Sequence, residues 1–78
     1  MGYYQKKLII NTNKIVDKSD IKKIFLQGNE RHKFVGIDVD KKNNRIAITY
    51  LIEGTSEDIY KISKKLYEME WFDSCKFE

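Results

Sequence analysis

The sequence contains no proline and only one cysteine, Cys75, among its 78 residues. A lone cysteine excludes a disulfide within the chain and a metal site built from several thiolates, and it is typical of a reducing compartment. No apolar run approaches the roughly 18 residues that a membrane-spanning helix needs, and the N-terminus lacks the apolar segment of a signal peptide. These absences favour a soluble domain on the cytosolic side.

A large excess of charge of one sign is also missing. Lysine and arginine contribute 15 residues and aspartate and glutamate 12, which gives a formal net charge of +3. A protein that binds nucleic acid through its phosphates needs a strongly basic patch, and the sequence shows none. We therefore expect no nucleic-acid partner.

Apolar residues are plentiful. They make up 41% of the sequence, and aromatic residues make up 13%, which is typical of a chain that folds around a packed core. The chain is too short for two cores, and no linker or low-complexity segment divides it. Residues 1–78 are therefore predicted to form a single domain.

The first half of the sequence predicts a strand and then a short helix. In residues 3–10, Tyr4, Leu8 and Ile10 fall on one side of a pleat and Lys7 and Ile9 on the other, and a polar stretch then ends the predicted strand. Ser19 is the predicted N-cap of the helix, and Gly28 and Asn29 are predicted to end it. Its apolar residues at helical spacing are Ile21, Ile24 and Phe25.

The second half predicts a β-hairpin, a longer helix and a closing strand. Residues 33–40 and 45–52 alternate like strands, and the polar residues 41–44 between them end in two asparagines that suit a tight turn. Thr55 and Asp58 resemble a capping box at the start of the helix. Residues 71–78 alternate again and are predicted to form the closing strand.

The predicted order of elements, β-α-β-β-α-β, indicates the α+β class and the ferredoxin-like split βαβ arrangement. In this fold a four-stranded antiparallel sheet carries two helices on one face, and the first and third strands are central. The predicted core comprises Leu8, Ile10, Ile21, Ile24, Phe25, Val35, Ile37, Val39, Ile46, Ile48, Ile59, Ile62, Leu66 and Phe77.

The other face of the sheet has no helix to cover it. The alternation places several apolar or weakly polar residues there, which can be scattered exposed side chains or one contact patch. We favour a patch that packs against a second copy or against another part of a longer chain. The predicted interaction surface comprises Ile9, Phe34, Ala47, Thr49 and Leu51.

The sequence lacks the residues that common activities of this fold require. The loop after the first strand has neither the glycines nor the arginine of a phosphate site, and no aromatic residues stand where RNA bases would stack. His32 is predicted to lie in a solvated loop, and Asp38 and Asp40 are predicted to flank a polar turn instead of binding Mg²⁺. We expect no enzymatic activity, no cofactor and no metal.

The stretch from ITYLIEG to SCKFE, together with the first strand and DKSDIKKIF, resembles the C-terminal cytosolic domain of MgtC/SapB-family membrane proteins. The resemblance implies an ACT-like fold and a regulatory or interaction domain at the cytoplasmic side of the cell membrane, in a protein linked to Mg²⁺ homeostasis. The implied partner is the protein's own membrane domain or a second copy, bound through the open sheet face.

The resemblance also leaves an alternative open, a stand-alone ACT-like sensor of a small molecule such as an amino acid. Its ligand would bind in the loop after the first strand, against a partner subunit. The residues of that loop which could contact a ligand are Asn11, Asn13, Lys14 and Asp17.

Overall fold

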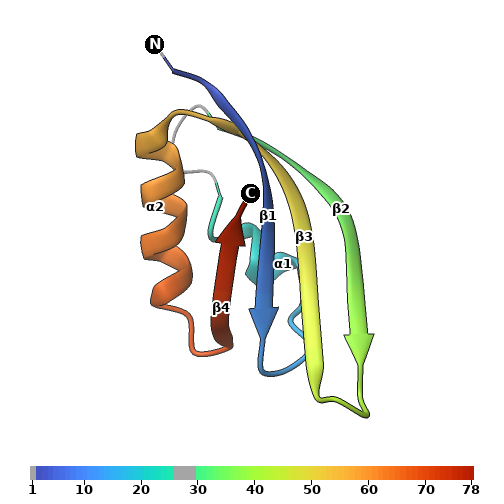
Figure 1. The fold of residues 1–78 in the computed structure, drawn as a ribbon. Coiled ribbons are helices and arrows are strands. Elements are labelled where there is room, and N and C mark those ends of the chain that lie inside the picture. Colours follow the sequence, from blue (N-terminus) through green and yellow to red (C-terminus); the bar gives the residue numbers. More distant parts are fainter. Residues whose placement is uncertain (1, 26–29) are drawn as a thin grey trace.

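The computed structural model describes residues 2–25 and 30–78. Its elements follow the predicted order: β1 (Tyr4–Thr12), α1 (Lys18–Lys22), β2 (Arg31–Asp40), β3 (Arg45–Gly54), α2 (Ser56–Tyr67) and β4 (Phe72–Phe77). Figure 1 shows the sheet with both helices, and the β2–β3 hairpin projecting past the end of β1.

The four strands form one antiparallel sheet in the order β2-β3-β1-β4. The predicted central position of the first and third strands is therefore confirmed, and β2 and β4 are the edges. One cluster of buried side chains combines the sheet with residues of both helices, Ile21 of α1 and Ile62 and Leu66 of α2. The architecture is α+β and is compatible with a ferredoxin-like fold.

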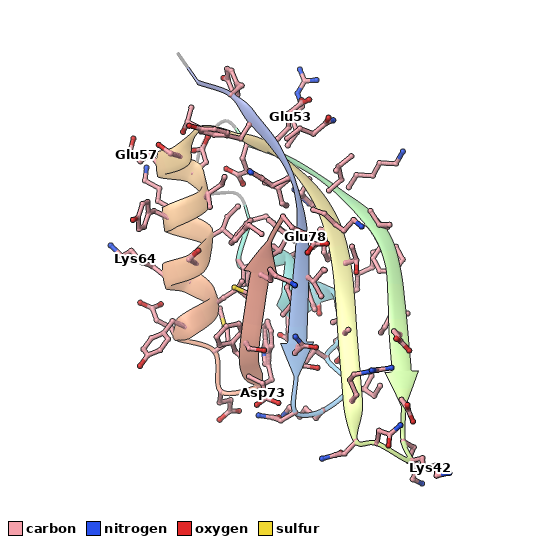
Figure 2. The ribbon with its side chains drawn as sticks, in the orientation of Figure 1. Lys42, Glu53, Glu57, Lys64, Asp73 and Glu78 are labelled. Carbon is pink, nitrogen blue, oxygen red and sulfur yellow. The ribbon has the colours of Figure 1, made fainter. Side chains whose placement is uncertain are left out.

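The turn of the β2–β3 hairpin is built by asparagine and aspartate side chains. Asp40 accepts hydrogen bonds from the backbone nitrogen of Asn43 at 3.1 Å and from its Nδ2 at 2.8 Å. These bonds hold the pKa of the Asp40 carboxyl below its usual value. Asn44 follows with a φ of 52°, a left-handed conformation that asparagine tolerates, so the predicted tight turn is confirmed. Lys42 lies at its tip (Figure 2).

Helix α2 begins with the capping box that the sequence predicts. The hydroxyl oxygen of Thr55 accepts a hydrogen bond from the backbone nitrogen of Asp58 at 3.2 Å, and the Asp58 carboxylate accepts one from the Thr55 nitrogen at 2.9 Å. The two bonds supply acceptors to the backbone N–H groups of Thr55 and Asp58, which have no acceptor within the helix. Glu57 and Lys64 point away from the sheet (Figure 2), so the opposite side of α2 faces the core.

Helix α1 is shorter and is not capped by a side chain. It begins at Lys18 with Asp17 as N-cap, so the prediction of Ser19 as N-cap is wrong. The Asp17 carbonyl oxygen accepts hydrogen bonds from the backbone of Asp20 and Ile21, but its carboxylate caps nothing. The predicted end of this helix at Gly28 and Asn29 lies outside the described residues.

The observed core confirms most of the predicted one and corrects part of it. Buried as predicted are Leu8, Ile10, Ile21, Ile24, Phe25, Ile48, Ile62 and Leu66. Tyr50, Ile52 and Trp71 are also buried, although they were not predicted as core. Ile46, Ile59 and Phe77 are only half-buried. Val35, Ile37 and Val39 were predicted to be buried, but they are 56%, 52% and 53% exposed, so that prediction is wrong.

An irregularity in β2 decides which way its side chains point. Phe34 lies opposite Tyr50, and Gly36 lies opposite Thr49, so Val35 is an extra residue in the strand. A bulge of this kind reverses the alternation on its two sides. Phe34 therefore lies on the helix side of the sheet with Tyr50, and its predicted place on the open face is wrong.

Candidate interaction surface

The open face of the sheet brings together four of the five residues predicted to form an interaction surface. Ile9 lies opposite Thr49 on the two central strands, and Ala47 and Leu51 are two positions away on either side of Thr49. All four side chains are half-buried, and we call them the open-face stripe. The stripe is narrow because the neighbouring positions are polar or charged. They include Lys7, Asn11, Lys33 and Lys76.

The larger exposed apolar surface is on strand β2. Its residues Phe34, Val35, Ile37 and Val39 are each about half exposed, and we call them the β2 patch. They make up four of the nine large hydrophobic residues that are exposed in the described part of the chain, and they come from one six-residue stretch. Ile37 and Val39 lie opposite Ile48 and Ile46, so they share the helix side of the sheet with Phe34.

An apolar groove adjoins the β2 patch. It has a volume of about 310 Å³ and lies between the α1 segment and strands β2 and β3. Its lining is mostly apolar, and Lys18 supplies the one charged side chain among these residues: Val16, Lys18, Ile21, Phe34, Ile37, Ile48 and Tyr50. The groove exists because the five-residue α1 is too short to cover β2.

Aromatic contacts hold the inner end of the patch in place. The rings of Phe34 and Tyr50 are nearly perpendicular, with a centroid distance of 5.7 Å, and the His32 ring stacks on Phe25 at 4.1 Å. His32 is thus a half-buried residue of β2, and the prediction that it lies in a solvated loop is wrong. Burial also raises the pKa of the Tyr50 hydroxyl above its ordinary value. Alternation along one segment does not predict this cluster, because it joins the end of the α1 segment, strand β2 and Tyr50 of strand β3.

Two asparagines of the loop predicted to bind a ligand serve the fold itself. The Asn11 side chain donates a hydrogen bond to the Ser74 hydroxyl at 3.2 Å, and the Asn13 side chain donates one to the Glu70 carbonyl at 3.0 Å. Their amides thereby tie the end of β1 to β4 and to the turn before it. The other two residues, Lys14 and Asp17, line a groove of about 520 Å³ between this loop and residues 68–71.

The remaining reactive residues also have structural contacts. Arg45 approaches the carboxylates of Asp38 at 3.2 Å and Asp40 at 3.8 Å, so both carboxylates face a guanidinium group. Within residues 2–25 and 30–78, no three histidine, cysteine, aspartate or glutamate residues are grouped to hold a metal ion. Cys75 packs against the core, and burial raises the pKa of its thiol.

Comparison with protein-family models, with curated proteins and with solved structures gives no match to this chain. The described helices include none that is long and apolar enough to cross a membrane. The surfaces of the domain are therefore the guide to its function. Of these, the β2 patch and its groove combine the most exposed apolar side chains.

Proposed function

We propose that this domain is a non-catalytic association module that binds a protein partner through the β2 patch. The observation that carries the proposal is the gathering of Phe34, Val35, Ile37 and Val39 on one strand, each about half exposed. Contiguous exposed apolar surface on a small domain marks a site of association, because leaving it in water is unfavourable.

The position of the patch supports association as well. Strand β2 is at the edge of the sheet, so the backbone groups on its outer side have no strand partner among the described elements. An edge strand can bind an extended segment through backbone hydrogen bonds, with specificity supplied by its side chains. The β2 patch thus offers apolar side chains and backbone donors and acceptors together.

The wider identity of the domain is proposed from the strand order and from a resemblance in sequence. The strand order β2-β3-β1-β4 fits a ferredoxin-like, ACT-like domain. The resemblance to MgtC/SapB-family proteins supports a regulatory domain at the cytoplasmic side of a membrane protein linked to Mg²⁺ homeostasis. Sequencing the gene upstream of Tyr3 tests this: several encoded transmembrane helices support it, and their absence contradicts it.

A small-molecule sensor is the second candidate function, and the groove beside the β1–α1 loop is the observation that favours it. Lysine and carboxylate side chains line this groove together, including Lys14, Asp17, Glu68 and Glu70, as a zwitterionic ligand such as an amino acid would require. A thermal-shift screen of amino acids and nucleotides tests it, because a ligand that binds the folded state raises the melting temperature. A reproducible rise of several degrees supports the sensor, and an unchanged melting temperature across the screen contradicts it.

Photo-crosslinking in cells that make the natural protein tests association through the β2 patch. A photoreactive amino acid replaces Ile37 in one variant and Tyr60 in a control, because Tyr60 is an exposed residue of α2 away from the patch. We expect a crosslinked product, identified by mass spectrometry, from position 37 and none from position 60. Equal yields from both positions, or no product from position 37, would contradict the proposal.

A further inference from the structure

We propose that the partner is a second copy of this chain, and that the two β2 strands pair antiparallel about a twofold axis between Val35 and Gly36. This inference rests on the proposed function, since it names the partner of the same β2 patch. It predicts a continuous sheet of two domains, with the apolar groove of each facing the other across the axis. The charge pattern of β2 is the evidence for it.

Strand β2 carries basic residues at one end and acidic residues at the other. Arg31 and Lys33 begin the strand, and Asp38 and Asp40 end it. In the proposed register Arg31 lies opposite Asp40 of the second copy, and Lys33 lies opposite Asp38 of the second copy. The twofold axis repeats both pairs. Opposite charges across antiparallel strands stabilise pairing, and like charges destabilise it.

The bulge at Val35 is what makes these charges meet on one face. Lys33 lies opposite Leu51 and Asp38 opposite Ala47, so both point to the open face. In a regular strand two residues an odd number of positions apart point to opposite faces. Without the extra residue Lys33 and Asp38 could not face each other in a symmetric pair. The bulge thus gives β2 a self-complementary edge.

The apolar side chains match in the same register. Phe34 and Ile37 both lie on the helix side of the sheet. In the proposed register Phe34 lies opposite Ile37 of the second copy, and Ile37 lies opposite Phe34 of the second copy. Phe34 and Ile37 are each about half exposed, and pairing covers each of them with an apolar side chain of the other copy. His32 lies opposite Val39 of the second copy, which places the ring next to another residue of the β2 patch.

Other registers satisfy fewer of these conditions. Shifting the pairing by one residue puts charged residues opposite apolar ones, because the faces no longer match. Shifting it by two residues keeps the charged residues on one face but leaves a single type of opposite-charge pair, either Arg31 with Asp38 or Lys33 with Asp40. Arg45, which already contacts both carboxylates, lies on the neighbouring strand, and the side chains of Asp38 and Asp40 remain 63% and 27% exposed. A carboxylate can accept hydrogen bonds from both directions.

A charge-exchange experiment tests the register directly. Sedimentation equilibrium is measured for the wild type, for Lys33→Asp, for Asp38→Lys and for an equimolar mixture of the two variants. Each variant alone places like charges opposite each other twice, so we expect its dimer Kd to rise about tenfold or more. In the mixture every such pair becomes attractive again, and we expect dimers that contain one copy of each variant. Lys7→Asp, on β1 away from the edge, is the matched control and keeps the wild-type Kd.

The outcomes separate this inference from the proposed function. If the wild type stays monomeric at protein concentrations up to about 1 mM, the second copy is not the partner and this inference is overturned. A mixture that dimerises no better than the single variants also overturns it. If position 37 then crosslinks to a different protein in cells, association through the β2 patch stands with another partner.

Discussion

The two halves of the helix-bearing face of the sheet differ in how well they are covered. On the side of α2, Ile62 and Leu66 of that helix are fully buried, and Trp71 is also buried. On the side of α1, Ile37 and Val39 lie on the same face of the sheet and are about half exposed. Both halves have apolar side chains in an alternating pattern, so the pattern alone does not determine burial.

The lengths of the helices account for the difference. Helix α2 has 12 residues and a complete capping box, whereas α1 has five residues and no capping side chain. A helix as short as α1 covers little surface, since each residue adds only about 1.5 Å of length. The helix-bearing face therefore has one half that α2 covers, which we call the finished half, and one half beside α1 in which the β2 patch stays exposed and accessible to a partner.

Removing equal side chains from the two halves should give the largest contrast. Ile62→Ala opens a cavity in the finished half and should lower the free energy of unfolding by about 2–5 kcal/mol. Ile37→Ala removes an exposed side chain and should change it by about 0.5 kcal/mol or less. Urea unfolding at low protein concentration, where association does not contribute, measures both. Similar losses for the two variants would contradict the difference in coverage.

Two glycines provide a second contrast. A Cβ at Gly54 would lie 2.9 Å from the Asp58 carboxylate and 3.2 Å from the Cβ of Glu30, so Gly54→Ala should cost about 1–3 kcal/mol. A Cβ at Gly36 would meet no atom within 4 Å, and Gly36→Ala should leave the free energy of unfolding within about 0.5 kcal/mol of the wild type. Thermal unfolding compares them. A harmless Gly54→Ala would show that the start of α2 is less tightly packed than described.

The starts of the two helices should respond differently to loss of their N-cap side chains. Thr55→Ala removes a capping hydrogen bond and should lower the free energy of unfolding by about 1 kcal/mol, while Thr55→Ser should retain it. Asp17→Ala should have less effect, because that carboxylate caps no backbone group. Chemical unfolding of all three variants checks this order. An equal loss of free energy of unfolding in Asp17→Ala and Thr55→Ala would contradict it.

The smallest effect concerns two thiols. Burial raises the pKa of Cys75 above its ordinary value of 9.0, so the native state holds this proton more tightly than the unfolded state. The free energy of unfolding should therefore fall as the pH rises above about 9, and Cys75→Ala should remove this part of the fall. At low protein concentration, where association does not contribute, a cysteine introduced by Ile37→Cys in the Cys75→Ala background should react with a thiol reagent at neutral pH faster than Cys75 does. Equal reaction rates would contradict the difference in burial.

Local patterns in the sequence predicted the elements, the central strands and the capping box at Thr55. They failed at β2, where regular alternation assigned Val35, Ile37 and Val39 to the core and Phe34 to the open face. Gly36 inside the strand was the available signal, since an isolated glycine in a strand often marks a bulge. The exposure of β2 also depends on the extent of α1 and on strand order, which are set by contacts between distant parts of the chain.

The most direct test of the account sets the β2 patch against the open-face stripe. Ile37→Asp and Leu51→Asp each place one carboxylate on an accessible strand position, on opposite faces of the same sheet. Sedimentation velocity of the two variants should show Ile37→Asp as a monomer and Leu51→Asp with the association of the wild type. An associated Ile37→Asp together with a monomeric Leu51→Asp would place the contact on the open face and contradict the account.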